Sequence, residues 1–476
     1  MFIDDLVRVP RSAARHPASA IRMNLPNYFL ADLPPEATLT GPMIGEACQT
    51  LKNNREKYLA ARSTRSLVEL LCEVAENWLR PQDPFRALAL EQGPAATGFS
   101  RATLARGLDA LFQQWTPAQF GALLNQDLGH SRRLDEMAAD ATEQKNSRAS
   151  FARGPELLVH FTAGRIPNPA LTSIALGLLT RSAQFVKCST GGGFLPRIFA
   201  HSLYDADPKL GACLEIAAWR GGEHSIEQAL YAEADCLTAT GSDHTLAAIR
   251  KHLPDRVRFL GYGHRVSFAY VASGALSAFQ ARKSVPRVAA DVVAWNQLGC
   301  LSPHVVYVEH GGSVAAEQFA EMLAEELARL EETEPRGEAP HESAATIASR
   351  RAFYDVRAAH SPDTRVWQSK DSTAWTVVYE ADARFQLSCL NRFIYVKGVT
   401  DLKTALESAD AVRGKVSTVG LAAPEEVTKD LATQLAHWGV ARVCPLGQMQ
   451  NPPLAWRHDG RPALADLIQW TDWEQG

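Results

Sequence analysis

The stretch "ELLVHFTAGRIPNPALTSIALGLLTRSAQFVKCSTGGG", residues 156–193, decides the fold class. It begins with a short apolar run typical of a buried strand, and a proline-containing loop then leads into an apolar run of helical length. A second short apolar run ends in three glycines. Two strands joined by one helix pack side by side as a parallel pair, so this stretch predicts a βαβ unit.

The same alternation continues downstream of this unit. A strand and turn at 235–242, a helix at 243–253 and a strand at 256–263 follow in order. Open parallel sheets bind their ligands beyond the carboxyl ends of the strands. The loops expected to carry function are therefore "TAGRIPN", "KCSTGGG", "TGSD" and "GYGHR".

Two further regions flank this part of the chain. From about residue 43 to 150 the apolar spacing is helical, with Ser100 as the expected N-cap of one helix. After Cys300 a second series of strands and helices begins, including a hairpin at 365–381. We predict an α/β fold with two Rossmann-like domains and a helical N-terminal layer. The expected domains are 1–150 (helical layer packed on the cofactor domain), 151–270 (nucleotide-binding domain), 271–445 (catalytic domain with Cys300) and 446–476 (tail returning to the cofactor domain or an oligomer interface).

The bulk composition narrows the class of protein. The chain has 476 residues, 21% of them charged, and a formal net charge of −4, which argues against a nucleic-acid partner. We expect no membrane span, because no run reaches about 18 apolar residues, and no secretory signal, because the N-terminus lacks an apolar core. The eight cysteines include no C-x-x-C pair, so we expect no metal site. We expect instead that the thiols are free and that the location is cytoplasmic.

Cys300 lies in "WNQLGCLSPHVVYVE", between a helix-like run and a β-rich run. A loop at such a junction exposes a sulfur while it holds the backbone N–H in place. A thiolate attacks carbonyl and thioester carbons and also leaves well, which suits a nucleophile. The alternative is an ordinary packed cysteine, because free cysteine is among the most buried residue types. The flanking glycine and the Ser-Pro turn argue against that alternative.

Three other loops carry candidate ligand groups. Lys187 ends a buried strand and is followed by Ser189 and Thr190, a set that suits ribose hydroxyls and phosphate; the alternative is a glycine-rich turn with a surface lysine. Gly241 and Ser242 stand where a helix N-terminus could hold a pyrophosphate, although Ser242 could simply cap that helix. No G-x-G-x-x-G follows a strand, and the order of lysine and glycine rules out a P-loop.

His264 follows the strand at 256–263 and is a candidate acid or base at neutral pH. The alternative is a solvated loop histidine. The spacing between His264 and Cys300 in the sequence does not distinguish between these two interpretations.

Together these residues resemble the LuxC-type acyl-CoA reductase branch of the aldehyde dehydrogenase superfamily. The resemblance covers roughly residues 60–475. Its most specific pieces are "GYGHRVSFAYV", "WNQLGCLSPHVVYVE", "LNRFIYVKGV" and the closing "LGQMQNPPLAWRHDGRPALADLIQWTDWE".

The resemblance implies an aldehyde-dehydrogenase-like fold with an oligomerisation arm. It also implies reduction of a fatty acyl thioester to an aldehyde by a nicotinamide cofactor. By position, Cys300 matches the nucleophile, and Lys187 matches the lysine at the adenosine ribose or its phosphate. Gly241 and Ser242 match the pyrophosphate turn. His264 matches the histidine of this branch, in a region where ordinary aldehyde dehydrogenases carry a glutamate base.

Three departures from the superfamily refine these expectations. Without the glutamate base, water is not activated to hydrolyse an acyl-enzyme, which favours reduction over oxidation to a free acid. Thr190 stands where many NAD-selective relatives carry a glutamate that repels a 2′-phosphate, so we expect NADPH. The first loop reads "AGRIPN", with Arg165 in place of the family's oxyanion-binding asparagine. Asn168 is the candidate for a displaced oxyanion donor.

The sequence leaves two other functions open. The first is an acylating aldehyde dehydrogenase that runs in the oxidative direction with the same residues. The second is a non-catalytic subunit that binds an acyl carrier or an acyl-protein synthetase. The unusual Arg165 is the feature that supports this second alternative. The expected partners are a fatty acyl-CoA or an acyl-carrier or acyl-protein synthetase, and the resemblance implies a homo-oligomer. The acyl chain length and the thioester donor are not readable from the sequence.

Overall fold

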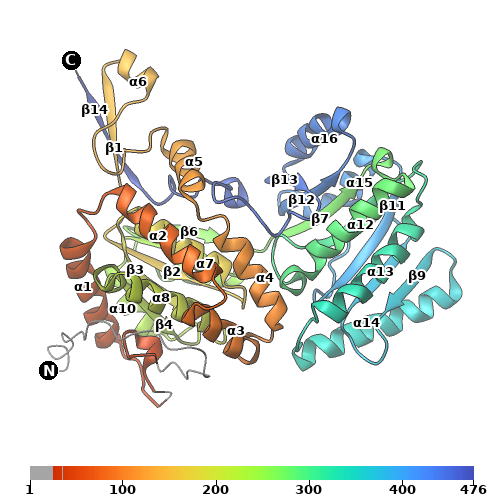
Figure 1. Cartoon of the computed structure of the whole chain (residues 1–476), viewed down its shortest axis with the longest axis horizontal. Coiled ribbons are helices and arrows are strands. Elements are labelled where there is room, and N and C mark those ends of the chain that lie inside the picture. Colours follow the sequence, from red (N-terminus) through yellow and green to blue (C-terminus); the bar gives the residue numbers. More distant parts are fainter. Residues whose placement is uncertain (1–24, 35, 476) are drawn as a thin grey trace.

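The computed structural model describes residues 25–34 and 36–475 and has two lobes (Figure 1). Each lobe is built around a mainly parallel sheet with helices on both faces. The predicted α/β class and the two Rossmann-like domains are confirmed.

A five-stranded parallel sheet forms the first lobe, in the order β4-β3-β2-β5-β6. Its central strands are buried on both faces, which explains their continuous apolar sequences. The prediction missed β4, a short strand with a glutamate inside it. The strands are β2 (Leu157–Phe161), β3 (Ala183–Cys188), β4 (Leu214–Ala218), β5 (Cys236–Thr240) and β6 (Arg258–Tyr262).

The helices of this lobe include the connections predicted from the apolar spacing. They are α7 (Asn168–Leu179), α8 (Phe194–Ala206), α9 (Pro208–Gly211), α10 (His224–Glu233) and α11 (Asp243–His252). The N-terminal helices are α1 (Gly41–Tyr58), α2 (Thr64–Leu79), α3 (Pro84–Thr97), α4 (Arg101–Phe112), α5 (Pro117–Leu128) and α6 (Ala141–Lys145). Ser100 caps α4, because its hydroxyl accepts a hydrogen bond from the backbone N–H of Thr103 at 3.1 Å.

The helical layer shares a core with the first lobe. Trp78 of α2 and Phe112 of α4 stack with ring centroids 5.1 Å apart, and both lie against Phe199 of α8. All three side chains are buried. Large aromatic contacts of this kind hold α2 and α4 against the sheet's own helices, so the layer and the first lobe form one packed unit.

A seven-stranded sheet forms the second lobe, in the order β13-β12-β7-β8-β11-β10-β9. Only β9 runs antiparallel to its neighbour, as the predicted hairpin requires. The change of sheet lies between β6 and β7, a few residues before the expected boundary at 270, because β7 pairs with β8 and β12. The strands are β7 (Val266–Val271), β8 (Pro303–Glu309), β9 (Thr364–Gln368), β10 (Thr376–Glu380), β11 (Phe393–Val399), β12 (Val416–Ala422) and β13 (Arg442–Pro445).

Separate apolar cores cover the two faces of this second sheet. The helices are α12 (Ala278–Val293), α13 (Ala316–Thr333), α14 (His341–His360), α15 (Leu402–Ser408) and α16 (Glu425–Trp438). No helix in the described part of the chain combines the length and the apolar character that a bilayer crossing needs.

A two-stranded antiparallel ribbon projects from the first lobe (Figure 1). It pairs β1 (Arg148–Arg153) with β14 (Gln469–Glu474), so the end of the chain returns to the first lobe. Every residue of β14 is exposed, including Trp470 and Trp473. Neither strand is predicted from the sequence, and β14 lacks a buried face that would create an alternating pattern.

Candidate active site

Cys300 follows a turn with an unusual backbone. Trp295, Asn296 and Gln297 have φ values of 50°, 52° and 61°, so three successive non-glycine residues are left-handed. Such conformations cost about 1–3 kcal/mol each and persist where the surroundings over-determine them. Here the Asn296 side chain donates to the carbonyl of Arg336 at 2.8 Å. The Gln297 side chain donates to the carbonyl of Pro303 at 2.7 Å.

The N-terminal helical layer also packs against this turn. The Trp295 ring packs on Gly107 of α4, where an added Cβ would lie 2.0 Å from Cζ2 of the ring. Phe99 meets the same ring edge to face, with centroids 5.2 Å apart. The turn before Cys300 is therefore braced by the N-terminal helices as well as by its own lobe.

Cys300 itself is partly exposed and lies at the junction of the two lobes. Its carbonyl accepts a hydrogen bond from Ser267 Oγ of β7 at 2.7 Å. A Cβ added to the neighbouring Gly299 would lie 3.4 Å from Ile166 Cδ1 and 3.0 Å from Gln450 Oε1. Ile166 belongs to the loop after β2, so the cysteine turn abuts one of the loops predicted to carry function.

The electrostatic setting of Cys300 favours the neutral thiol. Burial raises the pKa of Cys300 to about 12. The carboxylate of Asp459 adds to this rise in pKa, and the guanidinium of Arg265 opposes it. At neutral pH the sulfur therefore needs a proton acceptor before it can act as a nucleophile.

Lys187 occupies an aromatic recess at the carboxyl end of β3. Its Nζ lies 5.5 Å from the ring centroid of Phe161 and 5.7 Å from that of Trp219. Burial lowers the pKa of Lys187, and the nearby Glu227 partly offsets this. Within the described residues Lys187 Nζ makes no ion pair. The sequence analysis missed Trp219, because the preceding strand β4 was not recognised.

The other predicted cofactor loops lie at the same sheet edge as Lys187. Ser189 Oγ donates to the carbonyl of Gly164 at 3.1 Å, which ties the loop after β3 to the loop after β2. Thr190 is exposed. Gly241 donates its N–H to the carbonyl of Tyr262 at 3.1 Å.

Ser242 caps helix α11, which is the alternative that the sequence left open. Its Oγ accepts from the N–H of Thr245 at 3.1 Å. The hydroxyl is exposed and also contacts the hydroxyl of Thr245 at 2.9 Å. The cap does not exclude pyrophosphate binding, because a helix N-terminus carries several backbone N–H groups that have no intrahelical partner.

His264 is exposed in the connection between β6 and β7. Its backbone N–H donates to Asp243 Oδ1 at 3.2 Å. Burial lowers the pKa of the neighbouring His304 to about 4, and the charge of His264 contributes. The connection that carries His264 links the sheet of the first lobe to that of the second.

The two polar residues of the first loop point to the helical layer. Arg165 reaches the carbonyl of Thr97 at 3.4 Å. The Asn168 side chain donates from Nδ2 to the carbonyl of Gly107 at 3.1 Å, and its Oδ1 is buried with no hydrogen-bond partner among the described residues. One N–H of the Asn168 amide is thus engaged, so an oxyanion role would fall to the second N–H of Nδ2.

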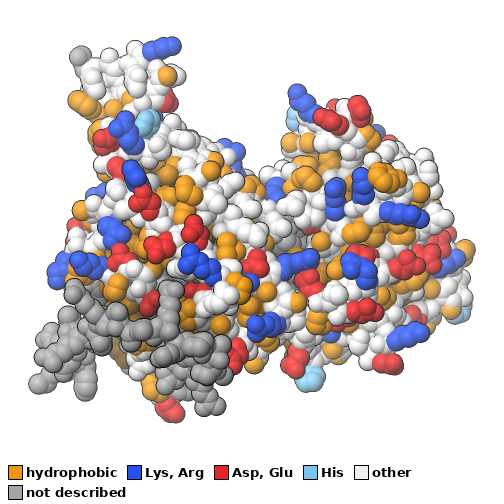
Figure 2. Space-filling view, in the orientation of Figure 1, with side chains coloured by type: hydrophobic (Ala, Val, Ile, Leu, Met, Phe, Trp, Pro, Cys, Tyr) orange, Lys and Arg blue, Asp and Glu red, His pale blue; other side chains and the backbone are white. Residues whose placement is uncertain are grey.

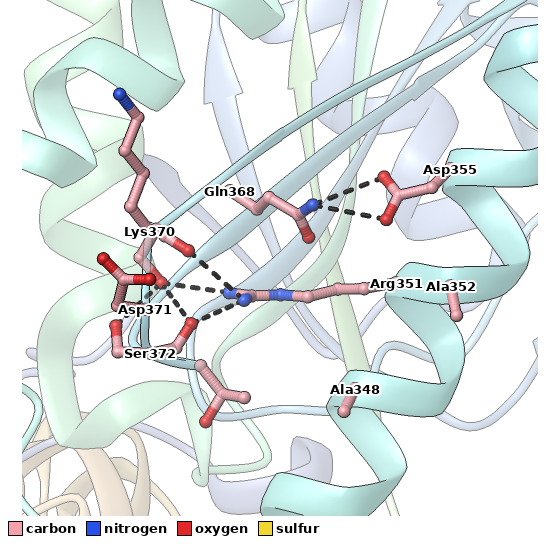
Figure 3. A pocket seen from close by; sticks show the side chains of 10 residues that line it. Ala348, Arg351, Ala352, Asp355, Gln368, Lys370, Asp371 and Ser372 are labelled. Carbon is pink, nitrogen blue, oxygen red and sulfur yellow. Dashed lines mark hydrogen bonds between the residues drawn. The ribbon is translucent and has the colours of Figure 1, made fainter.

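A separate hollow lies on the second lobe, between α14 and the loop after β9 (Figure 3). Arg351 spans it and donates to the carbonyls of Ser372 and Trp375, both at 2.6 Å. These hydrogen bonds occupy the guanidinium of Arg351, which therefore holds the loop after β9 in place. Within the described residues, no three histidine, cysteine or acidic side chains gather in a way that could hold a metal ion.

Comparisons with known proteins identify the family of the chain. A family model described as acyl-CoA reductase (LuxC) matches residues 59–470. The long-chain acyl-protein thioester reductase of Aliivibrio fischeri is 25% identical over 365 residues, 74% of this chain and 70% of that protein. The long-chain acyl-protein thioester reductase 2 of Photobacterium leiognathi is 24% identical over 327 residues, 67% of this chain and 64% of that protein.

Solved structures show the same fold. A putative aldehyde dehydrogenase from Burkholderia cenocepacia superposes with a TM-score of 0.68 at 15% identity, covering 92% of this chain and 93% of that one. An NAD-dependent benzaldehyde dehydrogenase from Corynebacterium glutamicum gives 0.66 at 13% identity, covering 92% and 91%. The predicted aldehyde-dehydrogenase-like fold is confirmed.

Proposed function

The chain belongs to the LuxC acyl-CoA reductase family of enzymes, and we propose that it reduces a fatty acyl thioester, an acyl-CoA or an acyl-protein, to the aldehyde with NADPH. The observation that carries this proposal is the place of Cys300. Cys300 is a partly exposed residue on a braced turn between the lobes, and the turn abuts the loop after β2. The loop after β2 is in turn tied to the loop after β3, because Ser189 Oγ donates to the carbonyl of Gly164, and this supports a nucleophile near the proposed cofactor loops.

In the proposed reaction, Cys300 attacks the thioester carbonyl and the thiol carrier leaves. The backbone N–H of Cys300 is the donor we assign to the developing oxyanion, with Asn168 as a second candidate. His264 assists proton transfer at the new aldehyde oxygen. Bound NADPH would supply the hydride for the acyl carbon, and cleavage of the bond between that carbon and the Cys300 sulfur would release the aldehyde and free Cys300.

The residues at the first sheet edge fit a nicotinamide cofactor that carries a 2′-phosphate. Lys187 is a cation without an ion-pair partner among the described residues, and two rings flank it. Thr190 adds no negative charge. Ser189 and the turn at Gly241 and Ser242 offer hydroxyl and N–H groups for the rest of the cofactor.

Labelling of Cys300 tests the proposal. Wild-type protein incubated with a long-chain acyl-CoA without NADPH should gain one acyl group on Cys300, seen by mass spectrometry of peptides. Cys300→Ala should gain none and should lose NADPH oxidation. The matched control is Cys389→Ala, because Cys389 is also partly exposed and free, and it should behave as wild type.

The outcome also separates the proposal from its alternatives. A wild-type protein that gains no acyl group from any acyl-CoA or acyl-protein donor would identify a non-catalytic binding subunit. Acylation without NADPH oxidation, together with CoA-dependent oxidation of an aldehyde, would favour the oxidative direction.

A further inference from the structure

Lys187 lies in a row of paired residues at the carboxyl edge of the first sheet. It is the register partner of Phe161 in β2 on one side and of Ala217 in β4 on the other. Residues paired across neighbouring strands point to the same face of a sheet, and that face recurs at every second residue. Trp219, two residues beyond Ala217, therefore returns to the face of the sheet that carries Lys187 and Phe161.

Two aromatic rings flank the ammonium group of Lys187. Nζ lies 5.5 Å from the ring centroid of Phe161 and 5.7 Å from that of Trp219. The two rings meet edge to face, with centroids 6.5 Å apart and an interplanar angle of 88°. Phe185, two residues before the lysine, packs on the Trp219 ring with centroids 6.0 Å apart. The Trp219 ring is therefore held in place from two sides beside Nζ.

Lys187 differs from the cations on the surface of the protein. On the face that Figure 2 shows, Lys and Arg side chains lie among Asp and Glu side chains. Lys187 is only 7% exposed, and among the described residues its Nζ makes no ion pair and no hydrogen bond. Glu227 acts on its charge from beyond ion-pair distance. A buried cation without a paired anion is costly, and an aromatic face close to it offsets part of that cost. The two rings are thus the contacts that hold this charge.

We propose that Trp219 is a positioning residue for cofactor binding, because its ring holds the Lys187 ammonium where a phosphate on the adenosine ribose would bind. The inference rests on the proposed NADPH-dependent function. Neither ring offers an oxygen or nitrogen acceptor, so the three N–H groups of the ammonium stay free for phosphate oxygens. Trp219 thus contributes to the preference for NADPH over NADH through Lys187.

An indole that only fills the apolar core makes a different prediction. Its replacement by leucine would lower the free energy of unfolding, and the affinities for nucleotides with and without a 2′-phosphate would fall together or stay unchanged. Removal of a positioning ring weakens only the nucleotide whose phosphate pairs with Lys187. The ratio of the two affinities therefore distinguishes the two roles of Trp219.

Titration calorimetry of the whole chain with adenosine 2′,5′-bisphosphate and with AMP measures this ratio without turnover. Trp219→Leu should bind the bisphosphate about tenfold more weakly, a loss of about 1.4 kcal/mol, which is the size of a desolvated cation–π contact. Its affinity for AMP should change little. Trp219→Phe should restore most of the bisphosphate affinity, because it keeps a ring, and Nε1 of Trp219 has no hydrogen-bond partner to lose among the described residues. Phe161→Leu removes the other ring and gives the same test if the Trp219→Leu protein does not fold.

Trp115→Leu is the matched control, because Trp115 is also a buried tryptophan whose Nε1 lacks a hydrogen-bond partner among the described residues, and it lies in a separate apolar core. It should bind both nucleotides as wild type does.

A Lys187→Gln background provides the second control. Adding Trp219→Leu there should cause no further loss of bisphosphate affinity, because the ring acts through the lysine. An unchanged affinity ratio in Trp219→Leu, a further loss without the lysine, or a Trp219→Phe protein as weak as Trp219→Leu would each overturn the inference. A wild-type preference for the bisphosphate that survives Lys187→Gln alone would instead contradict the proposed cofactor site, so the two failures are distinguishable.

Discussion

Arg392 donates a hydrogen bond from Nε to Oδ1 of Asn296 at 3.1 Å, and this bond joins two left-handed turns. Residues 390–392 have φ values of 58°, 52° and 65°, and they face the left-handed turn that precedes Cys300. Arg392 is fully buried and also pairs with Glu331 at 2.8 Å. One guanidinium therefore holds two strained turns in register at the base of the site.

Replacing Arg392 by Met should destabilise the protein by about 3–5 kcal/mol, because it leaves Asn296 and Glu331 without their buried partner. Urea unfolding measures this loss. The control is Arg413→Met, because Arg413 is exposed and its ion pair with Asp410 is long at 3.9 Å. That change should stay within about 0.5 kcal/mol of wild type. Equal effects of the two substitutions would contradict the bracing role of Arg392.

Gly107→Ala should impair turnover through the Trp295 ring. The added Cβ would stand 2.0 Å from that ring, so the turn before Cys300 must shift. We expect a loss of about 1–3 kcal/mol in stability and a lower kcat. Gly121→Ala in α5 is the control, because an added Cβ there meets nothing within 4 Å. It should stabilise by up to about 1 kcal/mol through helix propensity, with normal kcat.

Thr190→Glu should change cofactor choice. A carboxylate beside Lys187 repels a 2′-phosphate, so KM for NADPH should rise about tenfold or more, the effect of about 1.4 kcal/mol. KM for NADH should change little. Steady-state kinetics with both cofactors measure this, with Thr190→Gln as the uncharged control. A parallel rise in both KM values would show that the side chain blocks the site by size alone.

Glu215 should make the protein less stable as the pH rises. Burial raises the pKa of Glu215 to about 8, above its ordinary 4.5, while its Oε1 accepts the N–H of Leu30 at 2.6 Å. The folded state therefore holds a proton that the unfolded state releases first. The contribution of Glu215 to the free energy of unfolding is fully present below about pH 4.5 and is lost as the pH rises through about 8.

Glu215→Gln should flatten this dependence, because an amide keeps the shape and carries no titrating proton. Urea unfolding at pH 5, 6, 7 and 8 should show a slope of up to ~1.4 kcal/mol per pH unit in wild type that is reduced in the variant. Identical slopes in the two proteins would contradict the assignment to Glu215.

The sequence by itself determined the two α/β lobes and the junction that carries Cys300. Strands such as β2 and β3 are buried on both faces, so their sequences are continuous apolar runs rather than alternating ones. Glycine-rich loops at their carboxyl ends then mark one edge of the sheet. Cys300 can likewise be singled out from local sequence, because it lies where an apolar helix ends and an apolar strand begins.

Only the tertiary structure decided what surrounds the sulfur. The left-handed turn before Cys300 has no glycine signal, because distant partners such as Arg392 and Gly107 enforce it. Strand β14 has no buried face, and β4 carries Glu215, so neither shows the pattern that reveals other strands. Gln450 comes to the Cys300 turn from a segment far along the chain. Contacts of this kind depend on packing between lobes, which local periodicity does not encode.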